Sequence, residues 1–171
     1  MNRLYLIVFL VLCSICQNTT AKGKRYVSSM TENGILYFIL PDKMPRHGGV
    51  SAKKNMLYDL TCLSTGDSVS VTATVWTKQP CRLMHAGIIT AENMRMHNDV
   101  ETIFVEADKA GYKNRIRFKM AWDEFKCLYA SPVPFIVEFS NQISFAFTPK
   151  KWNAKRTEMN TIINIIELNR K

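Results

Sequence analysis

The sequence predicts a mainly β fold, an antiparallel β-sandwich or barrel of about eight strands with a short internal helix and a C-terminal helix. Short apolar segments are separated by turn formers along most of the chain, and the apolar period lengthens to that of a helix in only two places. An α+β variant, with the terminal helix packed on one sheet, is the alternative. The chain has 171 residues, 47% of them hydrophobic, which suits one domain with its own core and excludes wholesale disorder.

The strands of the first half are identified by the turns between them. Strands are expected over 26–30, 35–40, 56–63 and 68–77. Asn33 and Gly34 form a strong hairpin turn between the first two. Residues 41–55 are rich in turn formers and are interpreted as a loop. In the last of these strands valine and alanine alternate with serine and threonine, which is the period of a half-buried strand.

The second half contains both segments with helical periodicity. Strands are expected over 86–90, 101–107, 112–120, 135–139 and 143–147. The polar segment 92–99 is interpreted as a connection between strands. A short helix is predicted over 121–130 from the spacing of Trp122, Phe125 and Tyr129. Residues 150–171 form an amphipathic helix that Trp152 is expected to anchor on the sheet, although their β-branched residues leave a strand as the alternative.

The first 21 residues have the features of a secretory signal peptide. Arg3 gives a positive start, residues 4–12 are continuously apolar, and a polar stretch ends at the small residue Ala21. Cleavage after Ala21 leaves residues 22–171 as a single β-rich domain without a transmembrane span, either periplasmic or secreted. A retained membrane anchor is disfavoured because the apolar run is short for a bilayer.

The cysteines and the net charge give further expectations about lipid attachment, disulfides and partners. Lipid attachment at Cys13 or Cys16 is an alternative to simple cleavage, although both match the lipoprotein pattern poorly. Beyond residue 21 three cysteines remain, so at most one disulfide is expected among Cys62, Cys81 and Cys127. The whole chain carries 23 Lys and Arg against 14 Asp and Glu, and this formal net charge of +9 favours anionic partners.

The most informative segment is a strand with cations at every second position. These cations, the basic row, are Lys113, Arg115, Arg117 and Lys119. Apolar residues occupy most positions between them, so the cations share the outer face of the strand while the others face the core. Four cations spaced about 6.6 Å apart make a positive stripe about 20 Å long. Such a row suits an anionic polysaccharide, a lipid surface or an acidic protein partner.

The alternative is that the basic row is neutralised within the protein. The preceding strand is expected to pair with it through a tight turn, in a register that places Glu106 and Asp108 beside the cations. Two carboxylates would then offset two of the four positive charges. The remaining excess of about two charges would lie toward the Arg117 and Lys119 end, on a face that is otherwise only solvated.

A second basic cluster lies in the loop expected over 41–55. It consists of Lys43, Arg46, His47, Lys53 and Lys54, with two glycines among them. Glycines let a backbone approach an anion closely, and exposed loops often carry function. The spacing of a phosphate-binding loop is missing, however, and a solvated loop is the simpler interpretation.

The sequence contains no recognisable catalytic or metal-binding motif. Cys81, His85 and His97 match no zinc spacing, and nothing places a cysteine beside a histidine. No Gly-x-Ser-x-Gly or His-Glu-x-x-His signature occurs. His97 and Asp99 are acid–base candidates only if the fold gathers them in a pocket. We therefore assign no catalytic residue, no metal and no cofactor.

These observations predict an exported, non-enzymatic binding or assembly protein of the bacterial cell envelope, with its basic row facing an anionic partner. Nucleic acid is not expected as a partner because the chain is exported. A small exported hydrolase, with a site assembled from residues distant in the sequence, is one alternative. A structural subunit of an envelope complex is the other.

Overall fold

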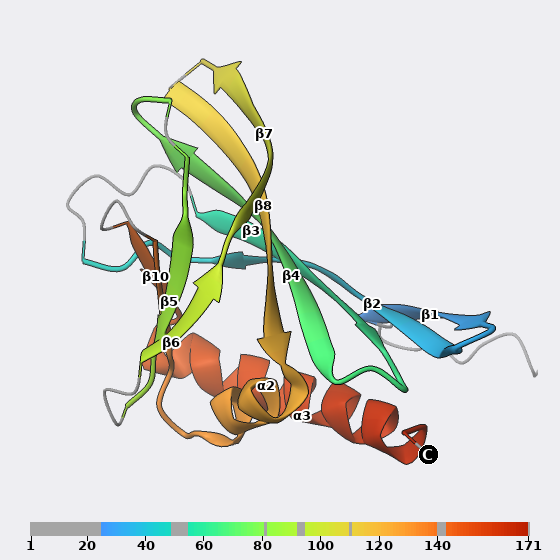
Figure 1. Ribbon diagram of the computed structural model, residues 1–171. Helices are drawn as coiled ribbons and strands as arrows, with labels where there is room; N and C mark the ends of the chain where they lie inside the picture. Colours follow the sequence, from blue (N-terminus) through green and yellow to red (C-terminus); the bar gives the residue numbers. More distant parts are fainter. Residues whose placement is uncertain are drawn as a thin grey trace, which may run out of the picture.

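The computed structural model describes residues 25–48, 55–80, 82–91, 95–109, 111–139 and 143–170. The strands are β1 (Tyr26–Thr31), β2 (Gly34–Met44), β3 (Met56–Leu63), β4 (Ser68–Thr77), β5 (His85–Ile89), β6 (Arg95–Asp99), β7 (Glu101–Asp108), β8 (Gly111–Ala121), β9 (Ile136–Phe139) and β10 (Ser144–Ala146). The helices are α2 (Trp122–Ala130) and α3 (Pro149–Leu168). The predicted mainly β fold, with an internal and a C-terminal helix, is confirmed (Figure 1).

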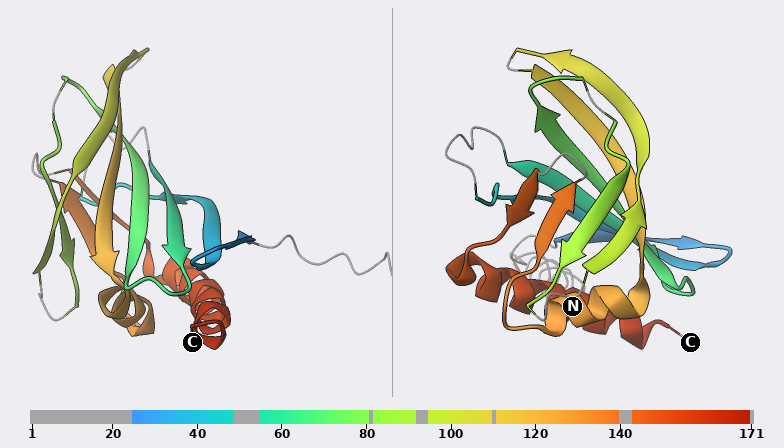
Figure 2. Two further views of the ribbon diagram at one scale, coloured as in Figure 1. Left: turned by 45° about the vertical axis from the view of Figure 1, so that its right-hand side comes forward. Right: turned by 60° about the vertical axis from the view of Figure 1, so that its left-hand side comes forward.

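The strands form two antiparallel sheets that face each other (Figure 2). The larger sheet has the order β1-β2-β3-β4-β8-β7 and the smaller one the order β10-β9-β5-β6. On one side β6 ends in the smaller sheet and, after Val100, the chain continues as β7 in the larger sheet. On the other side the chain continues past β2, and the backbone N–H of His47 donates to the Ser144 carbonyl of β10 at 2.8 Å. The two sheets are therefore connected on both sides of the core.

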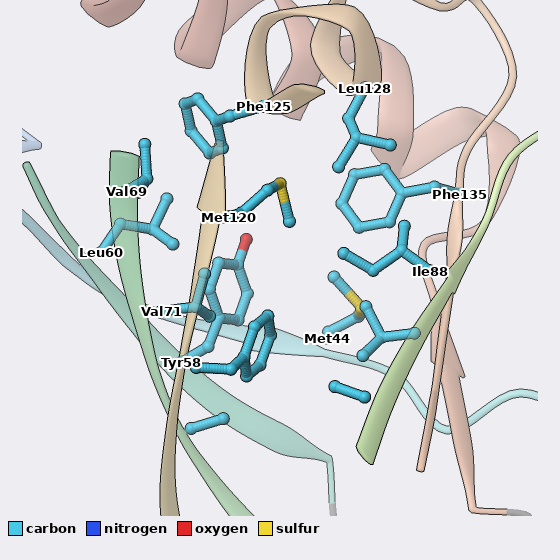
Figure 3. Close-up of a cluster of buried hydrophobic side chains, with 14 of the residues drawn as sticks. Met44, Tyr58, Leu60, Val69, Val71, Ile88, Met120, Phe125, Leu128 and Phe135 are labelled. Carbon is cyan, nitrogen blue, oxygen red and sulfur yellow. The ribbon is translucent and has the colours of Figure 1, made fainter. Parts of the chain in front are cut away.

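The core lies between the sheets and is covered at one end by the helices. Tyr58 and Val71 of the larger sheet face Ile88 of the smaller one, and Phe125 of α2 covers them from the helical end (Figure 3). A cavity of about 30 Å³ remains among these side chains. That volume is far too small for an organic ligand, so the interior is packing rather than a binding site. Neither helix in the described ranges is long and apolar enough to cross a membrane.

Three expectations about single elements are corrected or decided. The polar segment 92–99 contains β6, which forms an edge of the smaller sheet and so needs only one paired neighbour. The loop expected over 41–55 begins only after Met44, because residues 42–44 pair with residues 56–58 beyond an irregularity in β2. The last segment is a helix rather than a strand, and Trp152 is fully buried as its anchor.

Gly111, the first residue of β8, is expected to tolerate no side chain. Its φ is +133°, and a Cβ there would lie 2.2 Å from the carbonyl oxygen of Thr77. Gly111→Ala should lower the free energy of unfolding by about 2 kcal/mol or more, measured by urea denaturation. Gly87→Ala is the matched control, because the nearest atom to a Cβ at Gly87 is 3.6 Å away. Equal losses in both variants would contradict the prediction.

Candidate binding site

The basic row lies on the outer face of β8, as its alternation predicts. β8 pairs with β4 from Tyr112 to Ala121, and Ile116 and Phe118, which lie between the cations, are buried in the core. The helices lie below the sheets in Figure 1 and do not cover this face. Arg117 and Lys119 are exposed there. The row is therefore accessible to a partner.

Two cations of the row are held by carboxylates of β7. Arg117 donates from Nε and Nη2 to the two carboxylate oxygens of Glu101, at 3.1 and 3.2 Å. Lys113 Nζ lies 3.6 Å from a carboxylate oxygen of Glu106. Glu106 lies opposite Lys113, but Asp108 lies opposite Gly111, beyond the row, and the pairing of Glu101 with Arg117 depends on a bulge at Ile103.

Arg115 is held by a carboxylate that the sequence did not connect with the row. Its guanidinium crosses β4 and donates to Thr74 Oγ1 at 3.0 Å and to Asp59 Oδ2 of β3 at 2.6 Å. Asp108, which the expected register placed beside the cations, accepts a hydrogen bond from the Trp76 indole at 2.8 Å. Three cations rather than two are thus paired with carboxylates, and the excess within the row falls to one charge.

Lys119 carries that excess charge, since it has no ion-pair partner among the described residues. It borders a groove with a volume of about 590 Å³. Arg117 and Lys119 of β8 line one side of the groove, and Asn98 and Asp99 of β6 line the other. Glu101, where the chain enters β7, also contributes to the lining. The uncompensated end of the row is therefore concave rather than flat.

The groove includes two polar side chains from the strand that the sequence did not predict. Asn98 faces Ala86 across the sheet, and Ala86 is 0% exposed, so the Asn98 side chain points between the sheets. Its Nδ2 is buried and has no hydrogen-bond partner in the described structure. The Asp99 carboxylate is fully exposed and lies 3.3 Å from Nδ1 of His85. No apolar alternation in 95–99 could have indicated these positions.

The second basic cluster is only partly described and does not join the basic row. Lys43 belongs to β2 rather than to a loop, and Arg46 forms a bridge with Phe145 of β10. His47 is fixed to β10 by its backbone. β3 and β4 separate β2 from β8, and the remaining members, Lys53 and Lys54, lie outside the described residues.

The described cysteines are not paired with each other. Cys62 is buried in the core, and this burial raises the pKa of its thiol to about 11. Cys127 is exposed on α2. Cys81 lies outside the described residues, as do the segment interpreted as a signal peptide and its Cys13 and Cys16. Within the described ranges, no group of three or more His, Cys, Asp or Glu side chains could hold a metal ion.

The chain matches no protein-family model, and no curated protein or solved structure is significantly similar to it. The chemistry of the groove is thus the basis for a functional interpretation. It combines one unpaired ammonium group, a guanidinium already engaged by a carboxylate, an amide donor without a partner among the described residues, and the exposed Asp99 carboxylate. This set can hold a carboxylate and a neighbouring carbonyl group by hydrogen bonds and charge.

Proposed function

We propose that the protein is an exported, non-enzymatic binding protein of the bacterial cell envelope, and that the Lys119 end of the basic row contacts an acidic protein partner. The observation that carries the proposal is the unpaired Lys119 ammonium on the border of the groove. A cation that is not neutralised within its own sheet is available to pair with a carboxylate of a partner.

The pattern of charge on this face favours an acidic protein over a polymer or a lipid surface. Glu101, Glu106 and Asp59 lie among the cations and neutralise them. A continuous polyanion laid along the row would meet these carboxylates as well as the cations, and the two contributions would largely cancel. A partner with one or two well-placed carboxylates can pair with Lys119 without lying along the row, provided that they stay clear of the exposed Asp99 carboxylate on the other side of the groove. A groove also fits a protruding segment better than it fits a flat membrane.

Lys119→Ser should weaken binding of an acidic partner by roughly fivefold, because one ion pair is lost. The probe is a fluorescent glutamate-rich peptide, titrated with the full-chain protein across a salt series. Binding should weaken with salt, since the contact is between exposed charges. Lys150→Ser, which removes an exposed lysine from α3, is the matched control and should leave binding unchanged.

Two further probes separate the classes of partner. Dextran sulfate represents an anionic polysaccharide, and phosphatidylglycerol vesicles represent a lipid surface. If either of them binds more tightly than the peptide and responds to Lys119→Ser, the acidic-protein proposal is wrong. Equal binding of every probe by the wild type and both variants would mean that the basic row serves only solubility.

A structural subunit is the second candidate, because the β1–β2 hairpin exposes apolar side chains. Val27 is 56% exposed, Met30 83% and Phe38 43%. Exposed apolar residues gathered on one element indicate a protein contact. Co-purification of a stable complex at native expression levels would favour this function. The hydrolase alternative has less support, since Glu101 is engaged by Arg117, and Asp99 is fully exposed beside His85.

A further inference from the structure

We propose that the groove binds an extended segment of the partner as an added β-strand between β6 and the lower end of β8. This inference rests on the proposed function, and it specifies the form of the acidic partner. The proposed function assigns recognition to charge, whereas this inference assigns part of it to the backbone of the partner. The proposal combines three observations: two open strand edges, an unpartnered amide and an unpaired lysine.

The first observation is that β6 and β7, which are joined end to end through Val100, belong to different sheets. β8 pairs with β4 from Tyr112 to Ala121, but its pairing with β7 stops at Arg117. Residues 118–121 therefore have a strand neighbour on one side only, within the described ranges. β6 pairs with β5 and with no other described strand. β6 and the lower part of β8 diverge toward α2 in Figure 1, and the groove lies beside this division.

Open strand edges carry backbone N–H and C=O groups that point sideways and have no partner in the sheet. Such edges are templates for pairing with another extended chain. Natural proteins usually block them with charges, prolines or a covering helix. Here two edges flank one wedge-shaped gap: the backbones of β6 and β8 approach within 8 Å at their closest and diverge toward α2. A strand inserted at the wide end would pair with β8 on one side and with β6 on the other. The open part of β8 is four residues long, enough for about 13 Å of added strand.

The second observation is the amide of Asn98. Its Nδ2 is buried between the sheets and donates to no atom of the described structure. A buried donor without an acceptor is rare in folded proteins, and an occupant of the site is one explanation for it. The residue borders the groove. A carbonyl oxygen of an inserted strand would supply the missing acceptor.

The third observation fixes the side chains that the segment should carry. Along β8, Phe118 and Met120 face the core, whereas Lys119 faces outward. An inserted strand has the same alternation as its neighbours. Residues beside Phe118 and Met120 should be apolar, and the residue beside Lys119 should be acidic. The expected recognition sequence is therefore an acidic residue flanked on both sides by apolar residues.

The test uses the fluorescent peptide acetyl-Thr-Val-Glu-Val-Glu-Val-Thr-amide and the full-chain protein. Hydrogen–deuterium exchange is followed with and without the peptide. Exchange should slow in residues 95–99 and 118–121, because their open backbone groups become hydrogen bonded. An analogue with alternate backbone nitrogens methylated has the same charges but lacks those donors, and it should bind at least tenfold more weakly. Slowed exchange confined to other segments would contradict the proposal.

Asn98→Leu gives a second and independent readout. The substitution removes a donor that has no partner in the free protein, so the melting temperature should stay the same or rise. Peptide binding should nevertheless fall severalfold. Unchanged peptide binding by Asn98→Leu would contradict the assigned role of this amide. A fall in both stability and binding would indicate a structural role for Asn98 and would also contradict it.

The outcomes separate this inference from the proposed function. If the methylated peptide binds as well as the parent and Lys119→Ser still weakens both, strand addition is wrong while the acidic-partner proposal stands. If both peptides bind weakly and neither responds to Lys119→Ser, both proposals fail. Slowed exchange in 95–99 and 118–121 without any effect of Lys119→Ser would support strand addition and remove the role of the lysine.

Discussion

Replacing Trp152 with alanine is expected to lower the free energy of unfolding by about 4 kcal/mol. The indole is 0% exposed and holds α3 against the rest of the core. Its ring centroid lies 5.4 Å from those of Tyr129 and Phe135 and 6.0 Å from that of Phe147. Its N–H donates to the Ser131 carbonyl at 3.2 Å. Removing it leaves a large cavity and an acceptor without its donor.

The measurement is urea denaturation followed by far-ultraviolet circular dichroism, which does not depend on the deleted indole. Trp152→Phe keeps an aromatic ring in the cluster and should lose less than half as much stability. Val133→Ala, a truncation at a half-exposed position, is the control and should have little effect. If Trp152→Ala is no more destabilising than Val133→Ala, then α3 does not depend on this anchor.

Lys155→Met should lower the free energy of unfolding by about 3 kcal/mol at pH 7. The lysine is 6% exposed, and its Nζ lies 2.7 Å from Asp42 Oδ2 and 3.5 Å from Glu158 Oε2. Arg25 contacts both of these carboxylates from the other side, at 3.7 and 2.6 Å. Methionine fills a similar volume but leaves the Asp42 carboxylate without its shorter ion pair. Lys155→Met combined with Asp42→Asn should recover part of the loss, because no unpaired charge then remains.

This ion cluster also predicts how stability depends on pH. Burial opposes ionisation of Asp42, but the hydrogen bonds from Lys155 and from the backbone N–H of Lys43 outweigh it and lower the pKa. A carboxyl whose folded pKa lies below its unfolded value of about 4 stabilises the protein above that pH. The contribution is lost as the pH falls through the folded pKa.

The wild type should therefore lose part of its advantage over Lys155→Met on acidification. In the variant, Asp42 keeps its burial but loses its strongest partner, so its carboxylate no longer favours folding to the same degree. The difference in unfolding free energy between the two proteins should shrink between pH 6 and pH 3. Parallel pH profiles would show that Lys155 acts by packing rather than by charge.

Much of the fold follows from periodicities that are visible in the sequence. The strict alternation in β4 and β8, and the apolar stripe that includes Trp152, each bury one face, so sequence and structure agree there. The same rule fails for Arg95–Asp99, whose residues are mostly polar. That strand forms because its backbone pairs with β5. Pairing of this kind leaves no periodicity in a short polar segment.

The sequence predicted only part of the candidate site, and there are two physical reasons why it missed the rest. All four cations of the basic row occupy the predicted outer face. The bulge at Ile103 decides that Glu101 meets Arg117, and one extra residue in a strand cannot be read from alternation. Asp59 reaches Arg115 from two strands away, which requires the strand order of the sheet. Because Glu101 pairs with Arg117 and Asp59 with Arg115, neither carboxylate is left for Lys119.

The connections between the two sheets on both sides of the core have a consequence for how the chain folds. His47 and Ser144 meet across 97 residues, and Arg25 and Glu158 across 133. Contacts between such distant segments form only after a large loss of chain entropy, which slows folding. The early strands cannot complete their partnerships until β10 and α3 have been synthesised. We therefore expect slow folding in a single cooperative transition, with the N-terminal half dependent on the last thirty or so residues for its native state.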